Sequence, residues 1–390
     1  MSLCRTGIAA VVVSLVAACL AWAASGAAST RPAGVTPGQV VDRLGSTHVV
    51  GGYHFTDKNF LGEGADAILA TGMRVIKLYL HEPRVHYRPN SDWPESFADL
   101  VEMARHPYYR AVFDKPFHTF ILTTYSVTGK DVMGRWRDGY TDEEYAEDLR
   151  QFHDLTRHLL ATYEGTGKTF VLQHWEGDWA VRGNTDRSEK GDPSEERCRA
   201  MARWLNARQE GVERARKEAG HTGVKVYHAC EVNLVRNAMQ GRPTVTNNVL
   251  PHTHCDLYSY SAYDTIGLAS GDVAKGRAVF RDALDYIAAK APDSEAFGAK
   301  NVYVGEFGWP EVVSEKDPHT STDKSLNVIR MTVETALEWG CPYIVYWQVY
   351  DNECRVRDPR PTNADVRGFY LIKPDGTRSA ACDYLVSLLE

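Results

Sequence analysis

The most informative stretch of this chain is Val302-Tyr303-Val304-Gly305-Glu306-Phe307-Gly308-Trp309-Pro310. It begins with an apolar run of β-branched and aromatic residues, which is typical of a strand buried in a parallel sheet. The run ends on Glu306, and a carboxylate at the edge of an apolar core is costly unless it is paired or used. A second run, Thr169–Glu176, ends in the same way on Glu176. The two runs predict buried strands that bring two carboxylates to face each other across a cleft.

Strand-like and helix-like runs alternate along the rest of the chain. This alternation predicts a parallel sheet whose strands are joined by helices. We expect eight strands, at residues 49–55, 74–80, 118–125, 169–176, 224–231, 257–263, 302–306 and 343–348. Amphipathic helices are expected between most of them, at 64–72, 95–104, 142–163, 194–219, 276–290 and 322–339, with a loop-rich segment at 232–251. The predicted fold is therefore α/β, a single-domain (β/α)8 TIM barrel.

The N-terminus has the pattern of a secretory leader. Arg5 precedes an apolar segment and then small residues that suit signal-peptidase cleavage. We predict a signal peptide over residues 1–28, a linker over 29–44 and the barrel over 45–390, which makes the protein secreted or periplasmic. The stretch Val16-Ala17-Ala18-Cys19 also resembles a lipoprotein box, so a lipid anchor at Cys19 stays open. A stable membrane span is not expected, because the apolar segment is barely long enough to cross a bilayer.

The composition of the chain argues against some partners and cofactors. The 390 residues carry a formal net charge of −7 and no lysine- or arginine-rich tract, so nucleic acid is not an expected partner. Six cysteines remain after the leader, and none has the Cys-x-x-Cys spacing of a zinc or redox site. We expect neither a metal nor an organic cofactor.

The predicted strand ends carry carboxylates, amides, phenols and indoles. This mixture suits a polyhydroxylated ligand, because carboxylates accept hydrogen bonds from hydroxyls and aromatic faces cover the C–H patches of a sugar. Parallel barrels bind ligands at this end of their strands. We therefore predict a carbohydrate site with catalytic Glu176 and Glu306. Substrate contacts are predicted from His54, Lys77, Tyr125, His174, Trp175, Glu231, Asn233, Tyr260, Tyr263, Trp309 and Trp347.

In order and spacing these residues resemble the clan A retaining glycoside hydrolases, a (β/α)8 superfamily that includes cellulases, mannanases and β-galactosidases. The resemblance covers about residues 45–390 and implies that Glu176, ending the fourth strand, is the acid/base. It implies that Glu306, ending the seventh strand, is the nucleophile of a retaining double displacement. Trp347 matches the tryptophan that typically ends the eighth strand. Lys77 takes the place of the basic residue, usually arginine, that orients the nucleophile.

The resemblance also implies that Tyr260 or Tyr263 hydrogen-bonds the nucleophile. One position departs from the clan: Trp175 stands where asparagine usually precedes the acid/base glutamate. Asp178 and Glu231 are therefore alternative carboxylates for the role of acid.

Two other classes of function remain open. The first is a catalytically inactive barrel that binds carbohydrate. The second is a metal-dependent hydrolase that uses His252 and His254, which have the spacing of a metal-binding pair. Because this pair precedes the sixth predicted strand, we expect it at the opposite end of the barrel.

Overall fold

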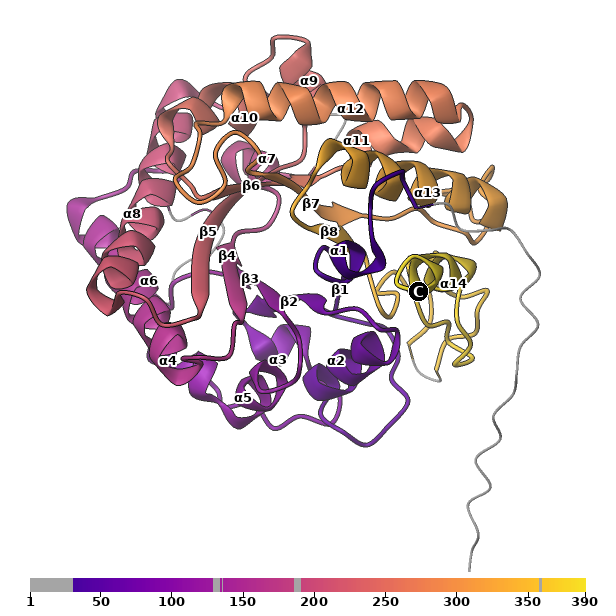
Figure 1. Cartoon of the computed structure of the whole chain (residues 1–390), viewed down its shortest axis with the longest axis horizontal. Coiled ribbons are helices and arrows are strands. Elements are labelled where there is room, and N and C mark those ends of the chain that lie inside the picture. The colour runs from indigo at the N-terminus through magenta and orange to yellow at the C-terminus, as the bar shows by residue number, and fades with distance from the viewer. Residues whose placement is uncertain (1–30, 129–133, 135, 186–190, 358–359) are drawn as a thin grey trace, which may run out of the picture.

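The protein is a closed barrel of eight parallel strands in chain order, with helices outside it (Figure 1). The computed structural model describes residues 31–390 except 129–133, 135, 186–190 and 358–359. Pairing of β1 with both β2 and β8 closes the barrel. The strands are β1 Leu44–Thr47, β2 Val75–Leu80, β3 Thr119–Thr124, β4 Thr169–Gln173, β5 Lys225–Val232, β6 Leu257–Ser261, β7 Val302–Phe307 and β8 Ile344–Tyr346. The predicted (β/α)8 fold is confirmed.

Four long helices cover much of the barrel, and each overlaps a helix predicted from the sequence: α6 Asp142–Thr162, α8 Glu195–Ala219, α12 Val273–Lys290 and α13 Thr322–Trp339. A capping box starts α6, in which Thr141 and Glu144 each accept a hydrogen bond from the other's backbone N–H. The shorter helices are α1 Pro37–Val41, α2 Phe60–Ala70, α3 Pro83–His86, α4 Leu100–Arg105, α5 Pro107–Phe113, α7 Gly177–Arg182, α9 Val235–Met239, α10 Val245–Asn248, α11 Tyr263–Ile266 and α14 Ala380–Ser387. Two 3-10 turns, η1 Leu250–His252 and η2 Gly267–Ser270, complete the set.

The first predicted strand, 49–55, is wrong. The observed strand β1 lies earlier, at Leu44–Thr47. Gly45 lets β1 approach β2, because a Cβ at this position would meet the Val75 carbonyl oxygen at 2.3 Å. The predicted strand begins at Val49 and Val50, which follow β1. Val50 has a left-handed φ of 44°, which is not a strand conformation. Val49 and Val50 instead line the cavity at the mouth of the barrel.

The barrel interior has an apolar layer below a polar one. A buried cluster, separate from the main core, takes one residue from each of the strands β2 to β7 and two at β8: Val75, Ile121, Val171, Ala229, Leu257, Tyr303, Tyr343 and Val345. Because strand side chains alternate between faces, the residues two positions further along also point inward. On five strands these are Lys77, Gln173, Glu231, Ser259 and Gly305. A charged layer thus lies just beneath the C-terminal ends of the strands.

The predicted leader, residues 1–28, lies outside the described residues, and the short helix α1 falls within the predicted linker range. No described helix has both the length and the hydropathy needed to cross a membrane. The six cysteines beyond the leader are all unpaired thiols, and five of them are buried. The described fold therefore contains no disulfide between these cysteines.

Candidate active site

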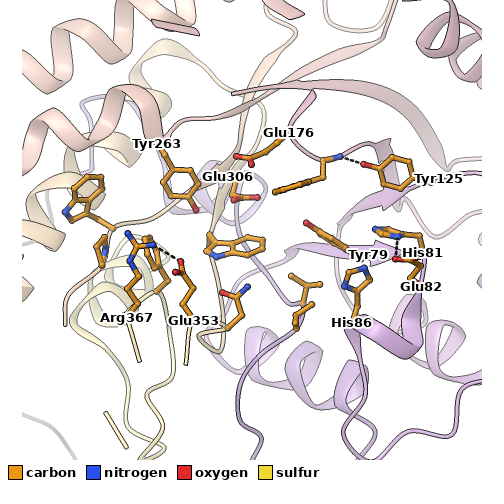
Figure 2. A pocket seen from close by; sticks show the side chains of 18 of the residues that line it. Tyr79, His81, Glu82, His86, Tyr125, Glu176, Tyr263, Glu306, Glu353 and Arg367 are labelled. Carbon is orange, nitrogen blue, oxygen red and sulfur yellow. Dashed lines mark hydrogen bonds and ion pairs between the residues drawn. The ribbon is translucent and has the colours of Figure 1, made fainter. Parts of the chain in front are cut away.

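A cavity of about 570 Å³ opens at the C-terminal ends of the strands (Figure 2). Both predicted catalytic glutamates line it. The full lining is Val49, Val50, Tyr79, His81, Glu82, His86, Tyr125, Trp175, Glu176, Tyr263, Glu306, Trp309, Pro310, Asp317, Trp347, Asn352, Glu353, Arg367 and Phe369.

An irregularity in β7 aims Glu306 into this cavity. Tyr260 of β6 pairs with Val304, but the next residue, Ser261, pairs with Glu306, so Gly305 is an extra residue on β7. Without this shift, alternation would place Glu306 on the outer face with Val304. Such bulges re-aim side chains beside active sites. A Cβ at position 305 would lie 1.8 Å from the Ser259 hydroxyl, so a larger residue would displace this hydroxyl from its hydrogen bond to Glu231.

Glu176 lies three residues beyond the end of β4, at the start of helix α7. Its backbone is strained into a positive φ of 28°, and its N–H donates to Oε1 of Glu231 at 3.0 Å. Its two carboxylate oxygens accept from neutral donors, the Ser261 hydroxyl and the Trp179 indole N–H, each at 2.7 Å. Within the described structure, Glu176 forms no ion pair.

Lys77 joins Glu306 to the charged layer below. Its Nζ lies 3.3 Å from a carboxylate oxygen of both Glu231 and Glu306, and donates to the Gly305 carbonyl at 3.0 Å. Glu231 also accepts from Gln173 and Ser259, at 2.9 and 2.7 Å. Lys77 and Glu231 are both fully buried. Glu231 is therefore a permanent counter-ion of Lys77, while Glu306 shares the same cation from the cavity side.

The surroundings of the two cavity glutamates differ in charge. Burial raises the pKa of Glu176 to about 7, and its hydrogen bonds from Ser261 and Trp179 only partly oppose this effect. Burial raises the pKa of Glu306 further, to about 8, and Lys77 is the main influence that opposes this rise. Tyr263 hydrogen-bonds Glu306 as well. These two pKa values do not by themselves assign a shared proton to Glu176. The direct contact of Lys77 with Glu306 is the feature that favours the ionised form of Glu306 over that of Glu176.

Five of the predicted substrate-contacting residues line the cavity: Tyr125, Trp175, Tyr263, Trp309 and Trp347. The Tyr125 hydroxyl accepts a hydrogen bond from the Trp175 N–H at 2.9 Å, which fixes the segment before Glu176 (Figure 2). Of the two tyrosines considered as partners of Glu306, Tyr263 makes the bond. Tyr260 is fully buried and hydrogen-bonds Asp264 and Thr265 instead.

The other predicted contacts lie outside this lining. Lys77 and Glu231 are fully buried beneath it. His174 is buried, and its Nε2 accepts from the Glu231 N–H at 3.1 Å. Asn233 lines an adjoining hollow that also includes Glu176. His54 is placed away from the cavity lining, with its Nδ1 3.2 Å from the Thr56 carbonyl.

The alternative acid, Asp178, is engaged elsewhere: it is buried and accepts from the backbone N–H groups of Asn233, Leu234 and Val245. His252 and His254 belong to no group of three potential metal ligands among the described residues. Such a group does occur on the cavity wall, where His81, Glu82 and His86 meet.

Two parts of the cavity wall were not predicted from the sequence. One is the group of His81, Glu82 and His86, which follows β2. The other lies between β8 and α14, where Arg367 forms an ion pair with Glu353 (Figure 2). Arg367 forms a second ion pair with Asp317, which precedes α13. The sequence offered one indication of the first group, which is that it directly follows the end of a predicted strand.

The fold and site together define a barrel with a buried carboxylate pair in an aromatic cavity. No family model and no curated protein matches the sequence. Solved structures of similar fold include a GH5_18 protein from Streptomyces cattleya in complex with GlcNAc (13% identity, TM-score 0.55, 89% of this chain and 79% of that one). A second is a family 5 xyloglucanase from Paenibacillus pabuli (11% identity, TM-score 0.53, covering 90% of this chain and 99% of that one). A third is an exo-β-1,4-mannosidase from an Opitutaceae bacterium (13% identity, TM-score 0.53, covering 89% of this chain and 59% of that one). The resemblance to clan A glycoside hydrolases is thus confirmed at the level of the fold.

Replacing Ser261 by alanine should shift the pH dependence of any reaction that needs protonated Glu176. The Ser261 hydroxyl stabilises the ionised carboxylate and so lowers the pKa of Glu176. In the wild type we expect kcat/KM to fall as pH rises above about 7, the value to which burial brings this group. In Ser261→Ala the pKa rises and the fall moves to higher pH. Ser294→Ala, whose hydroxyl serves a distant turn at Phe297, is the control; equal profiles for both variants would contradict this role of Ser261.

Proposed function

We propose that the protein is a secreted glycoside hydrolase that cleaves O-glycosidic bonds by a retaining double displacement. The observation that carries the proposal is the unequal setting of two buried glutamates in one cavity. Lys77 and Tyr263 contact Glu306, whereas Glu176 receives hydrogen bonds only from neutral donors. One ionised and one protonated carboxyl group are what glycoside cleavage requires.

In the proposed reaction, Glu306 is the nucleophile and attacks the anomeric carbon. Glu176 donates its proton to the leaving oxygen, which breaks the glycosidic bond and leaves a glycosyl–enzyme ester on Glu306. Glu176, now ionised, then removes a proton from the water that hydrolyses this ester. Lys77 stabilises Glu306 as a carboxylate before attack and again when the ester is released.

The cavity wall supports a carbohydrate as the substrate. Three tryptophans, Trp175, Trp309 and Trp347, line the cavity beside the glutamates, and indole faces suit the C–H surfaces of sugar rings. The structural neighbours include a xyloglucanase, an exo-β-1,4-mannosidase and a protein bound to GlcNAc. Poly- or oligosaccharides built from β-linked glucose, mannose or N-acetylglucosamine are therefore the first substrates to test.

The test is turnover of aryl β-glycosides of these three sugars, together with xyloglucan and β-mannan. NMR at early times follows the anomer released from a cleaved substrate. We expect the β-anomer to appear first and to equilibrate later with the α-anomer. An α-anomer formed first would contradict double displacement. Saturable binding of a sugar with no turnover would instead favour the carbohydrate-binding barrel.

A further inference from the structure

One group of side chains on the cavity wall has no part in this mechanism. His81, Glu82 and His86 follow the end of β2, and helix α3 turns the chain so that His86 returns over His81 (Figure 2). The two imidazole rings lie 4.6 Å apart between centroids, at 74° to one another. One ligand atom from each of the three residues lies within 4.8 Å of the other two.

Three of the four imidazole nitrogens of this group lack hydrogen-bond partners among the described residues. His81 is only 6% exposed, and its Nδ1 has no hydrogen-bond partner among the described residues. Both ring nitrogens of His86 are buried and equally without partners in the described structure. Buried polar atoms are normally hydrogen-bonded, so three unsatisfied nitrogens on one wall indicate a missing ligand.

The geometry fits a small cation better than a hydrogen-bonded group. Nδ1 of His81 faces Oε2 of Glu82 at 3.8 Å, which is too long for a hydrogen bond. Two ligands on a tetrahedral zinc ion, each about 2.0–2.1 Å from the metal, lie roughly 3.3 Å apart. A modest inward movement of Glu82, whose side chain is 54% exposed, would complete such a spacing.

We propose that His81, Glu82 and His86 bind one Zn²⁺ ion in the wall of the cavity. Two imidazoles and one carboxylate form a ligand set that zinc takes, with a fourth position left for water or another ligand. Imidazole nitrogen favours zinc over calcium or magnesium, which prefer all-oxygen sites. Since all three residues line the cavity, the fourth position faces it. This site does not depend on the proposed glycosidase function.

The test is metal content of the full chain, prepared without a polyhistidine tag and dialysed against ZnCl₂. We expect one zinc per chain in the wild type. Titration calorimetry with Zn²⁺ should show affinity lowered at least about 100-fold in Glu82→Gln and in His86→Ala, because even an outer-shell change costs up to that amount. Binding of Co²⁺ in place of Zn²⁺ should give visible absorption in the wild type that both variants lose.

Two features keep this test decisive. Glu82→Gln changes a half-exposed side chain, so it reports on the site even where His86→Ala does not fold. The double variant His252→Ala/His254→Ala removes the exposed histidine pair outside the cavity and should bind zinc as the wild type does. Substoichiometric zinc in the wild type, or unchanged affinity in Glu82→Gln, would overturn the proposal.

Discussion

Glutamine in place of Glu306 is expected to lower kcat/KM by roughly 10⁴- to 10⁶-fold, as loss of a catalytic nucleophile does elsewhere. The amide has the size of the carboxylate but cannot form the glycosyl ester. It also removes a carboxylate whose charged form is disfavoured by burial and by Glu176 and Glu231, while Glu231 still pairs with Lys77, so the fold should be retained. Steady-state kinetics on the best substrate, with a thermal unfolding curve for each variant, measures both effects.

The matched control is Glu353→Gln. Glu353 lines the same cavity but pairs with Arg367, away from Lys77. We expect its turnover to stay within about 10-fold of the wild type, because a uniform-binding contact changes KM more than kcat. Equal losses in the two variants would show that any carboxylate of the cavity is needed, and would refute a specific nucleophile at Glu306.

Glu176→Ala separates the two half-reactions. With a phenolic leaving group of low pKa, formation of the glycosyl ester needs little acid assistance, but its hydrolysis still needs the base. Turnover should therefore be slow and be restored by added azide, which attacks the ester without a base. Absence of such rescue, together with unchanged turnover, would exclude Glu176 as the acid/base.

The fold was predictable because seven of the eight strands are largely buried runs rich in apolar, β-branched and aromatic residues. Such runs are read directly from composition, as Val302–Phe307 illustrates. Strand β1 was not predicted because Leu44–Thr47 contains only one large apolar residue. The strand is buried because its neighbours pack closely around Gly45. Tertiary packing, and not local pattern, places this strand.

The two glutamates of the cavity were predictable for a related reason: each ends or closely follows an apolar strand. The depth at which each glutamate lies within the barrel was not predictable. Glu231 also ends a predicted strand, yet it lies below the cavity as the partner of Lys77. Only the bulge at Gly305 lifts Glu306 above that layer, and no sequence pattern announces the extra residue.

Replacing Lys77 by methionine is expected to destabilise the protein by about 3–5 kcal/mol, the cost of leaving a buried charge without its partner. Lys77 and Glu231 are both fully buried, and Glu306 shares the same cation. Urea unfolding of the wild type and of Lys77→Met gives the difference. Lys58→Met, which breaks the exposed ion pair with Asp66, should leave the midpoint almost unchanged.

A second substitution identifies the charge responsible. In Lys77→Met/Glu231→Gln the stranded carboxylate is neutral, so the double variant should be more stable than Lys77→Met alone. Its activity should not return, because Glu306 still lacks the cation that lowers its pKa and favours its ionised form at neutral pH. If the loss of stability in the double variant equals the sum of the losses in the two single variants, Glu231 and Lys77 are not a coupled pair. If stability and activity recover together, Lys77 supports the fold alone and has no role in holding Glu306 ionised.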